Sequence, residues 1–368
     1  MDDNTCAWLR IKQLGLRGRK WMQQLAFRPL HKVLQDPEHK LIQYGFKPEH
    51  LTELNAQTEQ SIEQELNWCR QSTNHHIIHW QHPAYPEQLK QIASAPLVLY
   101  AIGDIDLLQQ TQVAMVGSRH ASHYGADNAF AFAKDLAARG IIVTSGFASG
   151  IDGQAHKGAL AANGKTIAVF GTGVDVIYPK RHQSLYQQIA QTGLILSEFP
   201  PGTPPRPKHF PRRNRLISGL SLGVLVVEAA PKSGSLITAN YALEQGREVF
   251  AIPGSIHDPR TQGCHQIIQQ GAKLVTQTAD ILEELSAWHW QQQPVEIEKN
   301  LEKTQKSDKE NFTSHELLVN LDYEVTSIDE LVARTQQSIE VVLSQLLDLE
   351  IQGLIAATSG GYIRLRRE

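Results

Sequence analysis

One stretch of the sequence is rich in arginine and contains no acidic residue. No aspartate or glutamate occurs between Glu198 and Glu228. Five basic residues lie in this stretch: Arg206, Lys208, Arg212, Arg213 and Arg215. Arginine matches the geometry of phosphate oxygens, and helix N-termini attract anions. The pattern favours a site for a phosphate-bearing ligand over a solubilising surface loop.

The backbone character of the same stretch changes at Pro211. The prolines and the glycine that precede it cannot propagate a helix, whereas the residues after it can. Proline also suits the first turn of a helix. We therefore expect a loop that leads into a basic helix start, between two strands.

Glycine-bearing turns follow several predicted strands and carry further cations and hydroxyl groups. Gly117, Ser118 and Arg119 follow the first of these strands, and Lys180 and Arg181 follow a glycine turn farther along. A later turn supplies a cradle of amides and hydroxyls at a helix start: Ser233, Gly234, Ser235 and Thr238. Such a cradle can receive a phosphate group.

The candidate acid–base groups near these turns have structural explanations. Ser122 and Asp152 are each placed to cap the N-terminus of a predicted helix, and His156, Glu198 and Glu228 can be explained by packing or capping. No activated nucleophile, metal-ligand spacing or Walker-type phosphate loop occurs. We therefore expect a binding protein, with no catalytic residues, no metal and no cofactor.

Apolar segments alternate with helical segments from residue 112 onward. Strands are predicted at 76–80, 97–102, 112–116, 141–145, 166–170, 194–197, 223–228, 248–252 and 273–276. Helices are predicted at 124–138, 152–162, 183–191, 236–245 and 266–270. This alternation predicts the α/β class, with a doubly wound, mostly parallel sheet covered on both faces. Such sheets bind ligands at the carboxyl ends of their strands.

The segments before and after the α/β region indicate additional domains. Residues 1–75 indicate a helical domain, 76–286 the α/β domain, 287–312 a polar flexible linker and 313–368 a small C-terminal domain. Helices at 314–321, 328–334 and 339–351, followed by a hairpin, are typical of a winged helix. The third helix carries Glu340, Asp348 and Glu350, and residues 336–363 contain no lysine or arginine. A DNA reader needs basic residues, so we predict a protein-interaction module.

Size and composition are those of an ordinary globular protein. The chain has 368 residues, of which 41% are hydrophobic and 20% charged, with a net charge of -3. The three cysteines lie far apart, which argues against a disulfide framework. No signal-like start or membrane-length apolar run occurs. We therefore predict a cytoplasmic protein without a membrane span, in which any polyanion site is a local patch.

The motifs at the strand ends resemble those of the bacterial DNA-processing protein A (DprA/Smf) family. The matching segments are Val116-Gly-Ser-Arg119, Ser145-Gly-x-Ala-x-Gly-Ile-Asp152, Tyr178-Pro179, Phe210-Pro-x-Arg-Asn-Arg215, Ser233-Gly-Ser-Leu-Ile-Thr238 and Pro253-Gly254. The flanks resemble the N-terminal helical (SAM-like) domain and the C-terminal winged helix of family members. Ser149 departs from the pattern, because many members carry a basic residue there; Lys180, Arg181 or Lys208 would then compensate.

The resemblance implies an extended Rossmann-like domain that binds single-stranded DNA, forms a homodimer and helps load the RecA recombinase in natural transformation (competence). It implies a DNA groove lined by Gly117, Ser118, Arg119, Lys208, Phe210, Arg212 and Arg215, with Phe210 stacking on a base and Asn214 orienting the loop. The predicted DNA-binding set consists of the seven groove residues together with Lys180, Arg181, Arg213, Ser233, Gly234, Ser235 and Thr238.

An alternative function is a nucleotide-metabolising enzyme of the lysine-decarboxylase-like phosphoribohydrolase type. The sheet of that group is related, and its Gly-Gly-x-Gly-Thr phosphate loop superficially resembles the segment from Ser233 to Thr238. The second and third glycines of that loop are absent here. A transcription regulator, suggested by the winged helix, is disfavoured by the acidic third helix.

Overall fold

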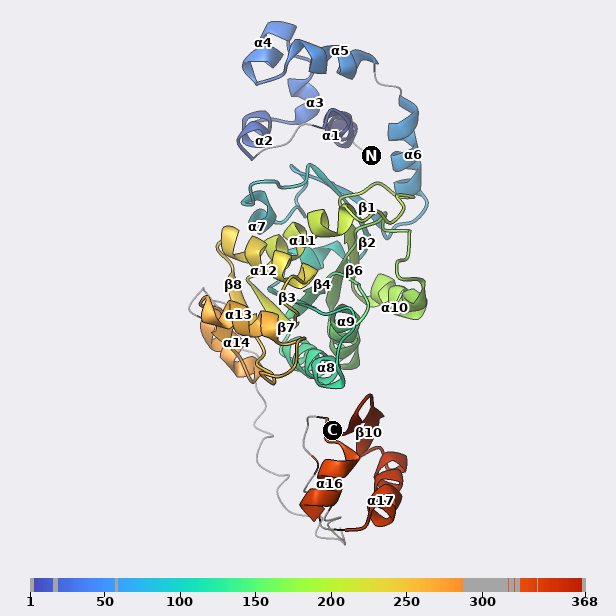
Figure 1. The fold of residues 1–368 in the computed structure, drawn as a ribbon. Coiled ribbons are helices and arrows are strands. Elements are labelled where there is room, and N and C mark those ends of the chain that lie inside the picture. Colours follow the sequence, from blue (N-terminus) through green and yellow to red (C-terminus); the bar gives the residue numbers. More distant parts are fainter. Residues whose placement is uncertain are drawn as a thin grey trace, which may run out of the picture. The chain divides into compact units, whose positions relative to one another are not determined.

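The computed structural model describes residues 3–15, 19–56, 59–286, 317, 321, 325–335 and 337–365. Contacts divide the chain into two compact units, Met1–Trp290 and Gln291–Glu368. The first unit contains the N-terminal helices and a large sheet, and the second contains a helix pair and a hairpin (Figure 1). The predicted domain boundaries at 75, 286 and 312 stay a prediction, and the predicted linker 287–312 lies outside the described residues.

Short helices form the N-terminal part of the first unit: α1 (Asp3–Gln13), α2 (Arg19–Leu25), α3 (Leu30–Val33), α4 (Glu38–Gln43), α5 (Pro48–Ala56) and α6 (Glu59–Arg70). Gln81, just after the first strand, joins them to the sheet. Its Oε1 accepts hydrogen bonds from Trp8 Nε1 at 3.1 Å and from the Leu30 amide at 3.2 Å. Its Nε2 donates to the carbonyls of Ala26 and Arg28. One amide side chain therefore ties α1, the end of α2 and the start of α3 to the sheet.

Nine strands form one sheet: β1 (His75–His79), β2 (Val98–Gly103), β3 (Gln112–Gly117), β4 (Ile142–Ser145), β5 (Thr166–Val169), β6 (Leu194–Ser197), β7 (Gly223–Glu228), β8 (Glu248–Ala251) and β9 (Lys273–Leu274). Their order is β1-β2-β6-β5-β4-β3-β7-β8-β9. Strands β3 to β9 are mutually parallel, and β2 is antiparallel to both of its neighbours. The predicted doubly wound, mostly parallel α/β sheet is confirmed.

The strand order reverses between β3 and β7. From β3 the chain adds β4, β5 and β6 on one side, and then places β7, β8 and β9 on the other. Loops that leave the carboxyl ends of β3 and β7 therefore run in opposite directions and leave a crevice between them. Open α/β sheets bind ligands at such a reversal.

Helices cover both faces of the sheet: α7 (Glu87–Lys90), α8 (His123–Ala138), α9 (Ile151–Ala161), α10 (Gln183–Thr192), α11 (His209–Leu220), α12 (Gly234–Glu244), α13 (Gln262–Gln269) and α14 (Thr278–Ser286). Successive side chains of a strand point to opposite faces. Val113 and Met115 accordingly share a buried cluster with residues of α8 and α9. Ala114 and Val116 belong to the cluster that includes residues of α11 and α12.

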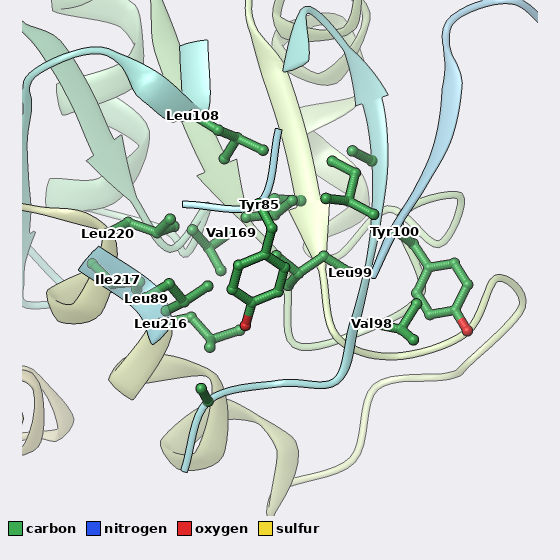
Figure 2. Close-up of a cluster of buried hydrophobic side chains, with 14 of the residues drawn as sticks. Tyr85, Leu89, Val98, Leu99, Tyr100, Leu108, Val169, Leu216, Ile217 and Leu220 are labelled. Carbon is green, nitrogen blue, oxygen red and sulfur yellow. The ribbon is translucent and has the colours of Figure 1, made fainter. Parts of the chain in front are cut away.

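Buried aromatic and aliphatic side chains fill the space between α7, α11 and β2. Figure 2 shows the ring of Tyr85 near Leu89, Leu216 and Val169. The Tyr85 hydroxyl donates to the Pro96 carbonyl at 2.6 Å, so this fully buried polar group has a partner. The packing fixes α11, the helix that carries the basic stretch, against the sheet.

The described elements of the second unit are α16 (Ile328–Thr335), α17 (Ile339–Ile351), β10 (Ile355–Thr358) and β11 (Gly361–Arg364). The two strands pair antiparallel, as the predicted wing requires. Ser327 Oγ accepts a hydrogen bond from the Glu330 amide at 3.2 Å and so caps the start of α16. Of the predicted helix 314–321, only Leu317 and Leu321 are described, and both are buried.

Candidate nucleic-acid interface

A hollow of about 610 Å³ lies where the strand order reverses. Its lining comes from the ends of β3 and β7, from the turn after β4, and from the starts of α11 and α12. The predicted site residues that line it are Gly117, Ser118, Arg119, Phe210, Arg213, Ser233, Gly234, Ser235 and Thr238. Residues separated by more than a hundred positions in the sequence thus meet at one edge of the sheet.

The turn after β3 is held to the end of β7. The Ser118 amide donates to the Glu228 carbonyl at 2.8 Å. Ser122 caps α8 by accepting from the Gly125 amide at 2.9 Å, as predicted, and its own hydroxyl donates to the Glu228 carboxylate. Burial raises the pKa of Glu228. Glu228 therefore serves as an anchor for this turn.

The turn after β4 packs directly on the turn after β3. The Ile151 amide donates to the Ser118 carbonyl at 3.1 Å. Gly150 has a φ of +75°, and a Cβ there would collide with that same carbonyl oxygen. Only glycine combines this backbone conformation with so close an approach.

The predicted capping role of Asp152 is wrong. Helix α9 begins at Ile151 with Gly150 as its N-cap, so Asp152 already lies inside the first turn of the helix. Its carboxylate instead accepts from the Ala148 amide at 3.2 Å, at the base of the hollow. Burial raises the pKa of Asp152, against the attraction of the nearby Arg213.

Arg213 is a buried cation in the floor of the hollow, with only 4% of its surface exposed. It donates to the Gly146 carbonyl at 2.5 Å and to the Val169 carbonyl, which lie at the ends of β4 and β5. Burial lowers the pKa of Arg213 to about 10, and the negative charge of Asp152 opposes that shift. Arg213 thus holds two strand ends together while keeping its charge at neutral pH.

Phe210 forms an aromatic wall of the hollow. It packs over Gly171, where an added Cβ would lie 2.9 Å from its ring. The Arg119 guanidinium lies 5.6 Å from the centroid of the Phe210 ring, and the centroid of the Tyr178 ring also lies 5.6 Å from it. Tyr178 is 48% exposed and lines the hollow, although it is absent from the site residues predicted from the sequence. A cation and two aromatic rings are therefore grouped at one place.

The start of α12 leaves polar groups facing the hollow. Ser233 is the N-cap residue, but its side chain makes no capping hydrogen bond, and its Oγ has no hydrogen-bond partner in the structure. Asn214 Nδ2 donates to the Gly234 carbonyl at 3.2 Å and so links α11 to α12. This contact fits the predicted orienting role of Asn214. Helix N-termini with open amides and hydroxyls attract anions.

Other predicted cations lie outside this hollow. Lys208 is the exposed N-cap residue of α11, between lining residues of the loop and helix. Lys180 and Arg181 are exposed in a short 3-10 helix, η2 (Lys180–His182), that follows Tyr178. These three residues are free to approach a ligand that extends from the hollow, and their roles stay predictions.

Arg212 and Arg215 do not line this hollow, and both form ion pairs with the carboxylate of Glu198. Arg215 Nη1 lies 2.8 Å from Glu198 Oε1, and Arg212 Nη2 lies 2.8 Å from Glu198 Oε2. Both arginines line a second hollow of about 220 Å³ that also includes Lys12 of α1. The sequence could not reveal this pairing, because Glu198 precedes the arginines by a whole loop.

Neither a cluster of metal-ligating side chains nor a membrane-spanning helix occurs in the part of the chain that the structure describes. Within the described ranges, no three histidine, cysteine, aspartate or glutamate side chains gather as metal ligands would. No helix in those ranges is both long and apolar enough to span a lipid bilayer.

The sheet order and the helices on both faces define an extended Rossmann-like α/β protein, and the second unit adds a winged-helix domain. The model of the DNA recombination-mediator protein A family matches residues 76–286, and the DprA winged helix domain matches residues 302–361. The chain therefore belongs to the DprA/Smf family.

Relatives agree with this assignment. Protein Smf of Escherichia coli (strain K12) is 48% identical over 309 residues, which covers 83% of this chain and 82% of that protein. DNA processing protein DprA of Streptococcus pneumoniae is 50% identical over 200 residues, covering 54% of this chain and 71% of that protein.

Two solved structures share the fold. The X-ray structure of DNA processing protein A from Streptococcus pneumoniae has a TM-score of 0.66 and 39% identity, covering 75% of this chain and 96% of that one. A structure of the Helicobacter pylori protein, which addresses its single-stranded DNA binding mode, has a TM-score of 0.53 and 29% identity, covering 58% of this chain and 97% of that one.

Proposed function

We propose that this protein binds single-stranded DNA through the hollow at the β3–β7 edge and acts as a recombination mediator. The observation that carries the proposal is the placement of Arg119 over Phe210, beside the uncapped start of α12. A flexible strand can turn a base toward the ring while its phosphates meet the cation and the amides. Family membership and the single-strand binding of the Helicobacter pylori relative support the same function.

The roles of the cations differ in this proposal. Arg119, Lys208, Lys180 and Arg181 are exposed and would contact the phosphate backbone along the strand. Arg213 would act mainly by holding the strand ends, because its Nη1 donates to protein carbonyls. Arg212 is 39% exposed and retains one edge for DNA despite its contact with Glu198.

The proposal includes binding without catalysis. Asp152, which lines the hollow, and Glu228, which anchors the turn after β3, are both buried and accept hydrogen bonds from backbone amides. The Ser122 hydroxyl, which donates to Glu228, is also engaged in capping α8. The protein would then protect incoming DNA and help load the RecA recombinase during natural transformation, as a cytoplasmic homodimer.

Fluorescence anisotropy with labelled single- and double-stranded oligonucleotides at two salt concentrations tests the DNA site. We expect preference for the single strand and an affinity that falls steeply with salt. The double variant Arg119→Ala/Lys208→Ala should weaken binding at least tenfold. It should also lower the salt slope by about 0.7 for each phosphate that the variant no longer neutralises.

Lys165→Ala is the matched control, because Lys165 is an exposed cation directly before β5, at the opposite edge of the sheet. It should leave both the affinity and the salt slope unchanged. Equal losses in the control and the double variant, or no loss in either, would contradict the site. Release of free base from nucleoside monophosphates, measured by chromatography, would instead support the enzymatic alternative.

RecA loading and dimerisation need separate measurements. The rate at which RecA hydrolyses ATP on DNA coated with single-strand binding protein should rise when the full chain is added, and less so with Arg119→Ala/Lys208→Ala. Sedimentation equilibrium should give twice the chain mass. A monomer, or an unchanged RecA rate, would contradict these parts of the proposal without affecting the DNA site.

A further inference from the structure

The outward face of α17 carries a continuous row of large apolar side chains. Ile339, Leu343, Leu347 and Ile351 are 51%, 42%, 58% and 76% exposed, respectively. Residues four positions apart are neighbours on a helix surface, so these four form one row along the helix. The neighbouring side of α17 is already buried in the core of its unit through Val342, Leu346 and Leu349. The row is therefore additional to what the fold of this unit requires.

Single exposed apolar side chains are ordinary, but a contiguous apolar surface on a small unit indicates a binding site. The charges beside the row identify the kind of partner. Each acid lies three positions from a member of the row, Glu340 from Leu343, Glu350 from Leu347 and Asp348 from Ile351, and residues three apart are neighbours on a helix surface. All three acids are exposed. No lysine or arginine occurs from 336 to 363. An anionic lipid surface or a nucleic acid would be repelled by this face.

A second copy of α17 is also disfavoured as the occupant. Pairing two such rows would bring the acids of one helix against the same acids of the other, and like charges that flank an apolar helix seam oppose pairing. An amphipathic helix with lysine or arginine beside its apolar residues would instead match both the row and the charges. Helices commonly dock on proteins through apolar residues spaced three and four apart.

We propose that the α17 row is the docking site for a basic amphipathic helix of a partner protein. The row supplies the apolar contact, and Glu340, Asp348 and Glu350 select lysine or arginine at its margins. This inference does not rest on the DNA site, which is formed by residues of the other unit.

The test uses the full chain and two synthetic helical peptides with the same leucines at four-residue spacing. One peptide carries lysines beside the leucines, and the other carries glutamates. Titration calorimetry should show at least tenfold tighter binding of the lysine peptide. The double variant Leu343→Ser/Leu347→Ser should weaken that binding at least tenfold. Leu243→Ser/Ile256→Ser removes two exposed apolar side chains of the other unit and should not change it.

A charge-reversal variant distinguishes specific docking from nonspecific hydrophobic binding. Glu340→Lys/Asp348→Lys should reverse the preference, so that the glutamate peptide binds more tightly than the lysine peptide. Equal binding of the two peptides before and after the reversal would overturn the proposal. So would a drop in the mass of the full chain, by sedimentation, when Leu343 and Leu347 become serine, because a second copy would then cover the row. Single-stranded DNA affinity should stay at the parent value in all these variants, so failure here is distinguishable from failure of the DNA site.

Discussion

Helices α11 and α17 depart from the usual amphipathic pattern in opposite senses. In α11, Arg213 and Arg215 are buried, each with less than a tenth of its surface exposed. In α17, Leu347 and Ile351 are left more than half exposed. Burying a charge and exposing a large apolar side chain both oppose folding, so each departure needs a separate explanation.

The explanation differs because the partners differ. The arginines of α11 find their partners inside the fold, in Glu198 and in the carbonyls of Gly146 and Val169. Arg213 thereby joins the ends of β4 and β5 at the edge of the sheet that carries the site. No partner for the apolar row of α17 lies in the described part of the second unit. Helix α11 therefore supports the DNA site through buried contacts, whereas α17 exposes an apolar surface.

The largest expected effect tests the internal role of α11. Arg213→Ala removes a buried cation and leaves Asp152 and two carbonyls without it, so the free energy of unfolding should fall by about 3–5 kcal/mol. Guanidinium denaturation measures this loss. Arg206→Ala, an exposed cation of the preceding loop, should change stability by less than about 0.5 kcal/mol. Similar losses in the two variants would remove the distinction between internal and external cations.

A second test uses pH, because the first unit also buries histidine. His156 is fully buried beside Thr166, and burial lowers its pKa from 6.5 to about 3. The unfolded chain takes up a proton below pH 6.5 and the folded chain does not, so the free energy of unfolding should decrease as pH falls from 6.5 toward 3. The slope is up to about 1.4 kcal/mol per pH unit.

His156→Gln keeps a polar side chain at that position without the titration. The variant should therefore show a flatter decline of stability with pH in the same denaturation experiment. Burial also lowers the pKa of His182 and His209, so part of the slope should remain. An unchanged slope would mean that His156 becomes protonated in the folded protein.

The third test separates stacking from charge within the DNA site. Phe210→Ala should weaken single-stranded DNA binding by about 1–3 kcal/mol, the contribution typical of one stacked base. The salt slope should not change, because no cation is removed, in contrast to the Arg119→Ala/Lys208→Ala variant. Phe210→Trp should retain most of the affinity. A lower salt slope in Phe210→Ala, measured by anisotropy, would show that the ring acts only by holding Arg119.

Most of the fold could be predicted from the sequence, because the apolar strands of a parallel sheet are short, separate and bounded by glycine turns. The nine predicted strands agree with the structure to within two residues at each end. Helix starts could be predicted less well. Asp152 is a good capping residue by type, but the conformation of Gly150 starts the helix before it. A local pattern cannot decide between two caps that lie so close together.

The site could be predicted only in part, for a different reason. Glycine turns, hydroxyls and Arg119 follow strands, and the carboxyl ends of parallel strands share one edge, so their meeting was predictable. Which arginines remain available was not, since Glu198 reaches across the loop to Arg212 and Arg215. Tyr178 was missed because its role depends on contact with Phe210, 32 positions later in the sequence. In both cases the outcome depends on contacts between residues that are distant in the sequence.

The smallest expected effect tests whether the two helices truly serve different partners. Glu340→Gln/Asp348→Gln removes two acids from α17 without adding cations, so single-stranded DNA affinity and its salt slope should stay within error of the parent protein. Both are measured by anisotropy, with Lys165→Ala alongside. Exposed side chains of this kind also change stability by less than about 0.5 kcal/mol. Tighter binding with a steeper salt slope would mean that the acids repel DNA that otherwise reaches the winged helix, and α17 would then belong to the DNA-binding surface.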